Sequence, residues 1–105
     1  NFYEVSLLDN SSLKIDITSI DIVQVIMDIV ISNYALIKNN KIEINNRVPE
    51  KQIKIYGEEI TCKRIIQNLV SNSIKYSTGY ISIELDELEN EVVFTIKNNV
   101  SNLKE

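Results

Sequence analysis

One segment constrains the fold of this chain most, because it combines an apolar stripe with a polar border on a single helix. An α-helix advances by about 100° per residue, so residues three, four, seven and eight apart share a face. Four polar side chains fall in this way within about a third of the circumference: Asn68, Asn72, Lys75 and Tyr76. The apolar stripe lies just beyond them, at Cys62, Ile65, Ile66, Leu69 and Ser73. The pattern predicts a helix that packs on a core and holds polar groups at its edge.

Length and composition predict one packed domain over residues 1–105. Such a chain is long enough for one hydrophobic core but short for a complete enzyme. Apolar residues make up 44% and charged residues 25%, with two glycines and one proline, which is typical of a globular fold and not of a disordered tail. We find no repeat and no low-complexity linker, so we expect no internal domain boundary.

Charge and residue usage exclude several classes of function. A net charge of −4 without a cluster of Lys and Arg argues against nucleic acid or an anionic membrane as the main partner. The chain has no histidine, so it contains no phospho-accepting histidine, no histidine-based triad and no imidazole zinc site. A single cysteine, Cys62, rules out a disulfide framework and is expected to be a small buried apolar residue.

No segment has the pattern of a membrane span or of a secretory signal. The longest apolar stretch, residues 20–37, is interrupted by five polar residues and is too polar to lie in lipid. Its apolar positions cover more than one helix face, which leaves two interpretations open. The helix is either buried between a sheet and a second helix, or it presents a docking surface for another segment.

Periodicity predicts the order strand, helix, two strands, helix, two strands. Alternating apolar residues indicate strands at 13–17, 42–48, 53–55, 81–85 and 92–96. Helices are predicted from a cap at Thr18 to about Lys38, and from Glu58 after Gly57 to Thr78-Gly79. Residues 1–8 are interpreted as the possible end of a preceding helix. This order fits an α+β two-layer sandwich, a mixed sheet with two long helices on one face.

The run from Asn68 to Ser77, N-L-V-S-N-S-I-K-Y-S, resembles the N box of the histidine-kinase ATP-binding domain, N-L-x-x-N-A-x-K-Y-S. The wider superfamily includes the ATPase domains of type II topoisomerases, mismatch-repair proteins and heat-shock chaperones, where a glutamate usually replaces the first asparagine. Asn68 therefore favours the kinase branch over an ATP hydrolase. The resemblance covers roughly residues 8–98, including Gly57-Glu58 where the family usually has Gly-Asp.

The resemblance implies a role for each polar residue of the box. Asn72, and with it Asn68, would supply oxygen ligands to the Mg²⁺ that bridges the phosphates of ATP. Asn68 cannot act as a general base, which suits phosphoryl transfer and not hydrolysis. Lys75 would meet a phosphate oxygen, and Tyr76 would lie against adenine. Arg64, one turn before Asn68, would assist the phosphates.

The stretch after the last predicted strand departs from the family pattern D-x-G-x-G. Asn98 stands where the aspartate would accept from the adenine amino group, and its carbonyl can still accept that hydrogen bond more weakly. Val100 and Asn102 replace the two glycines, and a β-branched residue at 100 resists positive φ. The lid and the closing strands that the family has further on would follow Glu105, so we expect an open sheet edge at Ile96.

The resemblance thus predicts the ATP-binding part of a bacterial two-component sensor histidine kinase. Its parent would transfer the γ-phosphoryl of ATP to a histidine on a dimerisation domain and then to a response regulator. That parent would be homodimeric and anchored in the cell membrane, with this domain in the cytoplasm, and the 105-residue piece would be inactive alone. The alternative is a degenerate ATPase-like module that binds no nucleotide and serves as an interaction or scaffold domain. The altered residues 98–102 favour that alternative, whereas the four retained polar residues oppose it.

Overall fold

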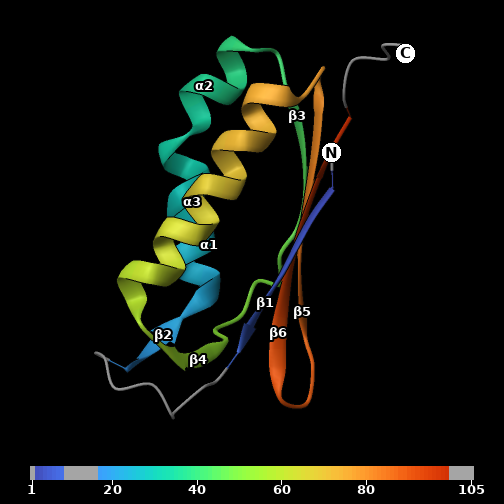
Figure 1. The fold of residues 1–105 in the computed structure, drawn as a ribbon. Helices are drawn as coiled ribbons and strands as arrows, with labels where there is room; N and C mark the ends of the chain where they lie inside the picture. The colour runs from blue at the N-terminus through green and yellow to red at the C-terminus, as the bar shows by residue number, and fades with distance from the viewer. Residues whose placement is uncertain (1, 9–16, 100–105) are drawn as a thin grey trace.

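The computed structural model describes residues 2–8 and 17–99, which form two layers (Figure 1). One layer is a four-stranded sheet in the order β1-β6-β5-β3, and the helices cover one face of it. The strands are β1 (Phe2–Leu8), β3 (Glu43–Arg47), β5 (Tyr80–Glu87) and β6 (Glu91–Asn98). The helices are α1 (Ile22–Ser32), α2 (Tyr34–Asn39) and α3 (Glu59–Tyr76). The predicted α+β sandwich with a mixed sheet is confirmed.

The sheet is mixed because β3 pairs with β5 in parallel, whereas β5 and β6 form an antiparallel hairpin. The hairpin was predicted from alternation, and its register places Ile83 opposite Ile96 and Leu85 opposite Phe94. All four side chains are at most 3% exposed, so this pair of strands forms the floor of the core. Two further strands, β2 (Thr18–Asp21) and β4 (Lys54–Gly57), form a separate antiparallel pair.

Residues 2–8 form strand β1, so the interpretation of this segment as the end of a helix is wrong. The strand pairs antiparallel with β6, from Phe2 opposite Lys97 to Leu8 opposite Glu91. An unpaired edge leaves backbone N–H and C=O groups without partners, and β1 satisfies those of β6. The edge that we expected to be open at Ile96 is therefore covered by the chain's own first segment.

The first helix begins at Ile22 and not at Thr18. Residues 18–21 pair with β4, which puts Ile20 opposite Ile55 in the core with 2% of its surface exposed. The cap is Asp21, whose carboxylate accepts from the backbone N–H of Gln24 at 3.2 Å. Of the strand predicted at 13–17, residues 13–16 lie outside the described residues, and Ile17 is not in a strand.

The predicted helix to Lys38 is interrupted at Asn33, where α1 ends and α2 begins. The Asn33 side chain is 6% exposed, and its Nδ2 donates to the carbonyl of Ile29 at 2.7 Å and to Oε1 of Gln67 at 3.3 Å. A short amide that bonds the backbone in this way competes with regular helix geometry. The bond to Gln67 also ties α1 to α3, which carries the candidate site.

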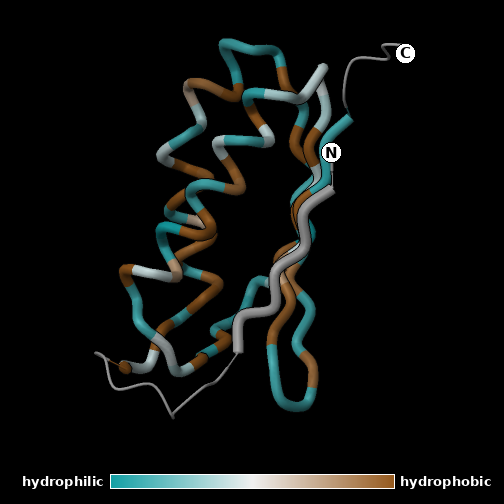
Figure 2. Tube along the Cα trace, in the orientation of Figure 1, coloured by the Kyte–Doolittle hydropathy of each residue, from teal (hydrophilic) through white to brown (hydrophobic). Residues whose placement is uncertain are grey.

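The apolar first helix was predicted either to be buried between the sheet and a second helix or to present a docking surface, and its inner face is buried. The buried residues of α1 are Ile22, Val25, Ile26 and Ile29, and they join a core cluster that includes α3 and the sheet. Figure 2 shows hydrophobic residues recurring along the helices and along β5 and β6. Ile31, Tyr34 and Leu36 remain more than half exposed, so the outer surface near the Asn33 break is apolar as well.

Replacing Asn33 by alanine should destabilise the protein by about 1–3 kcal/mol, because the carbonyl and the Gln67 amide that it contacts lie in a largely buried place. Asn40 offers a matched control, since its Nδ2 donates to the carbonyl of Leu36 at 2.7 Å but on the exposed surface. Asn40→Ala should change the unfolding free energy by less than about 0.5 kcal/mol. Urea unfolding of both variants measures the difference, and equal losses would contradict the proposed role of burial.

The second long helix agrees well with its prediction. Glu58 is its N-cap residue, and the Thr61 hydroxyl donates to the Glu58 carboxylate. Cys62 is buried as expected, and burial, with Glu58 and Glu59 nearby, raises the pKa of its thiol, which keeps it neutral at ordinary pH. Past its end, Gly79 has a φ of 137°, a conformation that favours glycine.

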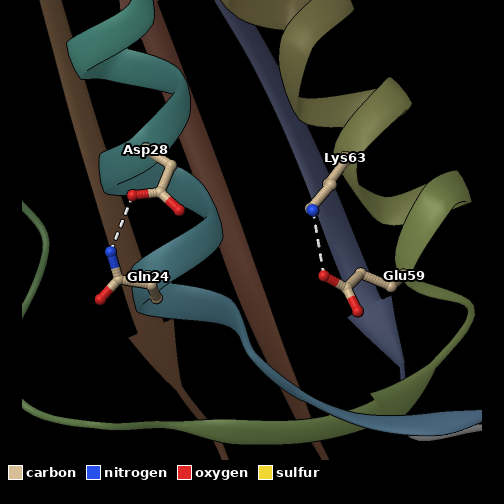
Figure 3. A network of polar contacts seen from close by, with 4 residues as sticks. All are labelled: Gln24, Asp28, Glu59 and Lys63. Carbon is tan, nitrogen blue, oxygen red and sulfur yellow. Dashed lines mark hydrogen bonds and ion pairs between the residues drawn. The ribbon is translucent and has the colours of Figure 1, made fainter.

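Polar contacts on the outer helix surfaces add little to stability. Figure 3 shows Gln24 donating to Asp28 at 2.7 Å on α1, and Lys63 paired with Glu59 at 3.0 Å on α3. Both are exposed pairs four residues apart, each worth about 0.2–0.5 kcal/mol. The core cluster therefore holds the two layers together. Among the described residues, no helix is both long and apolar enough to cross a membrane.

Candidate functional site

Helix α3 places the predicted site residues on one exposed face. Its buried residues point toward α1 and the sheet: Cys62, Ile66, Val70, Ser73 and Ile74. The polar residues singled out from the sequence are all exposed: Arg64, Asn68, Asn72, Lys75 and Tyr76. Because all five belong to one helix, their common face follows from the helical repeat alone.

The apolar stripe predicted beside this face agrees with the structure except at Ile65. Cys62, Ile66 and Ser73 are buried as expected and Leu69 is half-buried against the core, whereas Ile65 is half-buried outside the core cluster. Lys75 lies roughly opposite the core, at about 180° around the helix from Ile66. Within the described residues, a ligand on this face would contact α3 from one side only.

Lys75 and Tyr76 contact each other on this face. The Lys75 ammonium lies 5.2 Å from the centroid of the Tyr76 ring, which is 48% exposed. This is a cation–π distance, and such an exposed pair is worth about 0.5–1 kcal/mol. The contact is weak enough for Lys75 to leave the ring for an anionic ligand.

The charge of the face is positive in an otherwise acidic chain. Residues 64–76 contain Arg64 and Lys75 but no Asp or Glu, although the whole chain has 15 acidic residues and a net charge of −4. Such a local excess of positive charge favours an anion. The described residues also contain no group of His, Cys, Asp and Glu that could hold a metal ion. A cation on this face would therefore need amide oxygens from Asn68 and Asn72 together with oxygens of the ligand.

Asn98 lies at the end of β6 and is buried, so it is not part of the exposed face of α3. Its side chain is 6% exposed and shares the helix side of the sheet with Phe94 and Ile96. Its Nδ2 donates to the backbone carbonyl of Asn99 at 3.1 Å. Asn99 in turn bonds the turn after α3, so Asn98 lies beside the carboxyl end of the site helix. Val100 and Asn102, the two glycine replacements, lie outside the described residues.

Ser73 is a polar residue to which the sequence assigned no role. Its side chain is completely buried between α3 and the core, and its hydroxyl has no hydrogen-bond partner among the described residues. A buried hydroxyl without a partner costs about 1–3 kcal/mol. A serine within an apolar stripe is the sequence signal that points to such a group.

Hollows lined by described residues include two that lie away from the exposed face of α3. One of about 290 Å³ lies between β4 and the β5–β6 turn, lined by Lys54 and Glu89 among others. The other, of about 360 Å³, is apolar and lies between the helices α1 and α2 and the region of β3, with Tyr34 and Ile44 in its lining.

Comparison with known proteins supports the fold but gives little at the level of sequence. No protein-family model and no curated protein sequence matches this chain. Among solved structures, the nucleotide-free catalytic domain of histidine kinase ThkA matches with a TM-score of 0.78 at 16% identity over 87% of this chain. Histidine kinase AdeS of Acinetobacter baumannii matches with a TM-score of 0.62 at 13% identity over 86%. The cytoplasmic segment of histidine kinase QseC matches with 0.59 at 12% over 90%.

These matches show that the chain has the fold of histidine-kinase catalytic domains, as the resemblance implied. The share of the other chain that is covered is 63% for ThkA, 70% for AdeS and 85% for QseC. The chain therefore spans about three fifths of the ThkA domain. At these identities the likeness concerns the arrangement of helices and strands, and the chemistry has to be argued from the residues.

Proposed function

We propose that this chain is the ATP-binding part of a sensor histidine kinase and that ATP with Mg²⁺ binds on the exposed face of α3. The observation that carries the proposal is the set Asn68, Asn72, Lys75 and Tyr76, exposed together on α3 of a chain that has the histidine-kinase catalytic fold. Taken singly, each residue would be an ordinary surface residue. Their combination on one helix, without a nearby carboxylate, favours a nucleotide.

The phosphate side of the site belongs to α3. Mg²⁺ prefers hard oxygen ligands and keeps several waters, so neutral amide oxygens of Asn72 and Asn68 fit it when phosphate supplies the charge. Lys75 provides a point charge for a phosphate oxygen, and Arg64, one turn earlier, adds a second cation. These residues bind and orient the triphosphate.

The base side of the site lies toward the end of α3. The Tyr76 ring offers an aromatic surface for adenine at the last position of the helix. Asn98, at the end of β6, has a buried amide oxygen that would accept from the adenine amino group once the base reaches it. The base would then be recognised by the end of α3 together with the end of β6, and the phosphates by the rest of the α3 face.

The reaction of the parent protein would be phosphoryl transfer to a histidine. Asn68 carries no carboxylate that could activate water, so hydrolysis is disfavoured and the γ-phosphoryl is kept for another acceptor. The chain contains no histidine, so the acceptor must lie on another domain, with a response regulator receiving the phosphoryl group next. A homodimeric, membrane-anchored parent with this domain in the cytoplasm is part of the same proposal.

The chain should bind a non-hydrolysable ATP analogue when Mg²⁺ is present, and a chelator should remove most of that affinity. Isothermal titration calorimetry of this chain, and of a longer version that continues past Glu105, measures both. Binding by the longer version alone would still support the proposal, since further residues are then needed to cover the open face. If neither version binds, the chain is better explained as an interaction or scaffold module.

A further inference from the structure

The carboxyl ends of α3 and β6 are joined through one residue, Asn99. Its backbone N–H donates to the carbonyl of Tyr80 at 3.2 Å, and its carbonyl accepts from the N–H of Thr78 at 3.1 Å. Its side-chain Oδ1 accepts from the N–H of Tyr80 at 2.9 Å and lies 3.3 Å from the hydroxyl of Ser77. Asn99 therefore contacts three residues of the turn that follows α3.

The turn itself is held by Ser77, the residue that ends α3. Its hydroxyl accepts from the backbone N–H groups of Gly79 and Tyr80, both at 3.0 Å. The Tyr80 N–H thus has two acceptors, one from Ser77 and one from Asn99. With only one hydrogen, the Ser77 hydroxyl donates either to Asn99 Oδ1 or to the Tyr80 carbonyl, which lies 3.1 Å away.

Asn99 also holds the side chain of its neighbour Asn98. The Asn99 carbonyl accepts from Nδ2 of Asn98 as well as from the N–H of Thr78. The orientation of the Asn98 amide is therefore coupled to the position of the turn after α3. That turn begins one residue after Tyr76 and two after Lys75.

We propose that Asn99 is a positioning residue of the nucleotide site, which holds the base-recognising amide of Asn98 in a fixed place relative to the end of α3. Asn99 would act without touching the ligand, through the bonds described above. The inference rests on the proposed function, because it assigns Asn98 and Tyr76 to the base and the other site residues of α3 to the phosphates and Mg²⁺. The inference adds that the side chain of Asn99 sets the distance between the Asn98 amide and the end of α3. In the family pattern D-x-G-x-G, the backbone freedom of the glycines would have that role.

The proposal is tested by two substitutions at the same position. Asn99→Ala removes the side-chain acceptor of Tyr80 and Ser77, and it should lower the affinity for the Mg²⁺-bound ATP analogue about tenfold, the effect of about one hydrogen bond. Asn99→Asp keeps an acceptor oxygen in the same place, so its affinity should stay within about threefold of the unchanged protein. Calorimetry is carried out on whichever version of the chain binds the analogue.

Magnesium tripolyphosphate separates positioning from a general loss of structure, because it contacts the phosphate side only. Asn99→Ala should leave its affinity unchanged while the affinity for the ATP analogue falls. Equal losses for both ligands, no loss for either, or a loss in Asn99→Asp as large as in Asn99→Ala would each overturn the proposal. If the unchanged protein binds tripolyphosphate and the analogue equally well, the base side is not used and the inference fails while phosphate binding stands.

A third substitution, at Ser77, covers the case in which Asn99→Ala does not fold. Ser77→Ala removes a single hydroxyl and leaves the backbone bonds of Asn99 in place. Relative to the unchanged protein, it should weaken binding of the ATP analogue and leave tripolyphosphate binding unchanged. An unchanged affinity for the analogue, or equal losses for both ligands, would overturn the proposal. Absence of any nucleotide or tripolyphosphate binding by the unchanged protein would instead refute the proposed function together with this inference.

Discussion

Asn72→Ala should remove magnesium-dependent binding of the ATP analogue, with a loss of affinity of at least about 100-fold. The amide oxygen of Asn72 is the proposed protein ligand to Mg²⁺, and alanine offers no replacement for it. Without the cation, the phosphate charge would be met by Lys75 and Arg64 alone. Calorimetric titration with Mg²⁺, repeated with a chelator, measures the part of the affinity that depends on the metal.

The fold should tolerate this change, which makes the test specific. Asn72 is exposed in the middle of α3, and alanine is a better helix former by a few tenths of a kcal/mol, so stability should be kept or slightly raised. Asn90→Ala in the β5–β6 turn is the matched control, since it removes the same exposed amide far from α3. Retained metal-dependent affinity in Asn72→Ala would exclude Asn72 from the site.

Phe94→Ala should reduce the free energy of unfolding by about 3–5 kcal/mol, because a large side chain is removed from a packed core. Phe94 is completely buried and lies in β6, between Leu85 of β5 and the backbone of Val5 in β1. A domain of this size is stable by about 5–15 kcal/mol, so the variant would lose a large share of its stability. Urea or thermal unfolding followed by circular dichroism measures the shift.

Leu88→Ala removes a similar apolar side chain from the exposed β5–β6 turn, where half of its surface is accessible to solvent. We expect a change below about 0.5 kcal/mol in that control. A small effect of Phe94→Ala, comparable with that of Leu88→Ala, would mean that the core between the helices and the sheet is not packed as described.

Much of the fold follows from local periodicity. The β5–β6 hairpin and helix α3 were predicted because alternation and the helical repeat are each strong over eight or more residues. The start of α1 was missed because Ile20 fits both patterns, and its pairing with Ile55 depends on a strand more than thirty residues away. Asn33 interrupts the first helix through a bond to Gln67, which is equally distant in the sequence.

The same limit applies to the candidate site. The exposed face of α3 was predictable because all its residues belong to one helix. Which side of that helix is buried depends on the other elements that pack against Ile66 and Val70. The contribution of Asn99 arises where β6 meets the end of α3, and no periodic pattern indicates it. The serine at 73 stands out within an apolar stripe, but the lack of a hydrogen-bond partner among the described residues depends on the packing around it. The roles assigned to Asn68, Asn72, Lys75, Tyr76, Asn98 and Arg64 remain predictions until ligand binding is measured.

The pairing of β1 with β6 determines how this domain would respond to mechanical force. Because the strands are antiparallel, the amino end of β1 and the carboxyl end of β6 lie at the same end of the sheet, with Phe2 opposite Lys97 (Figure 1). Tension between these two ends would break the hydrogen bonds between β1 and β6 one residue pair at a time, and would not load all of them at once. A pull on the amino end of β1 would therefore detach this strand at low force, while the β5–β6 hairpin and the core beneath the helices stay intact.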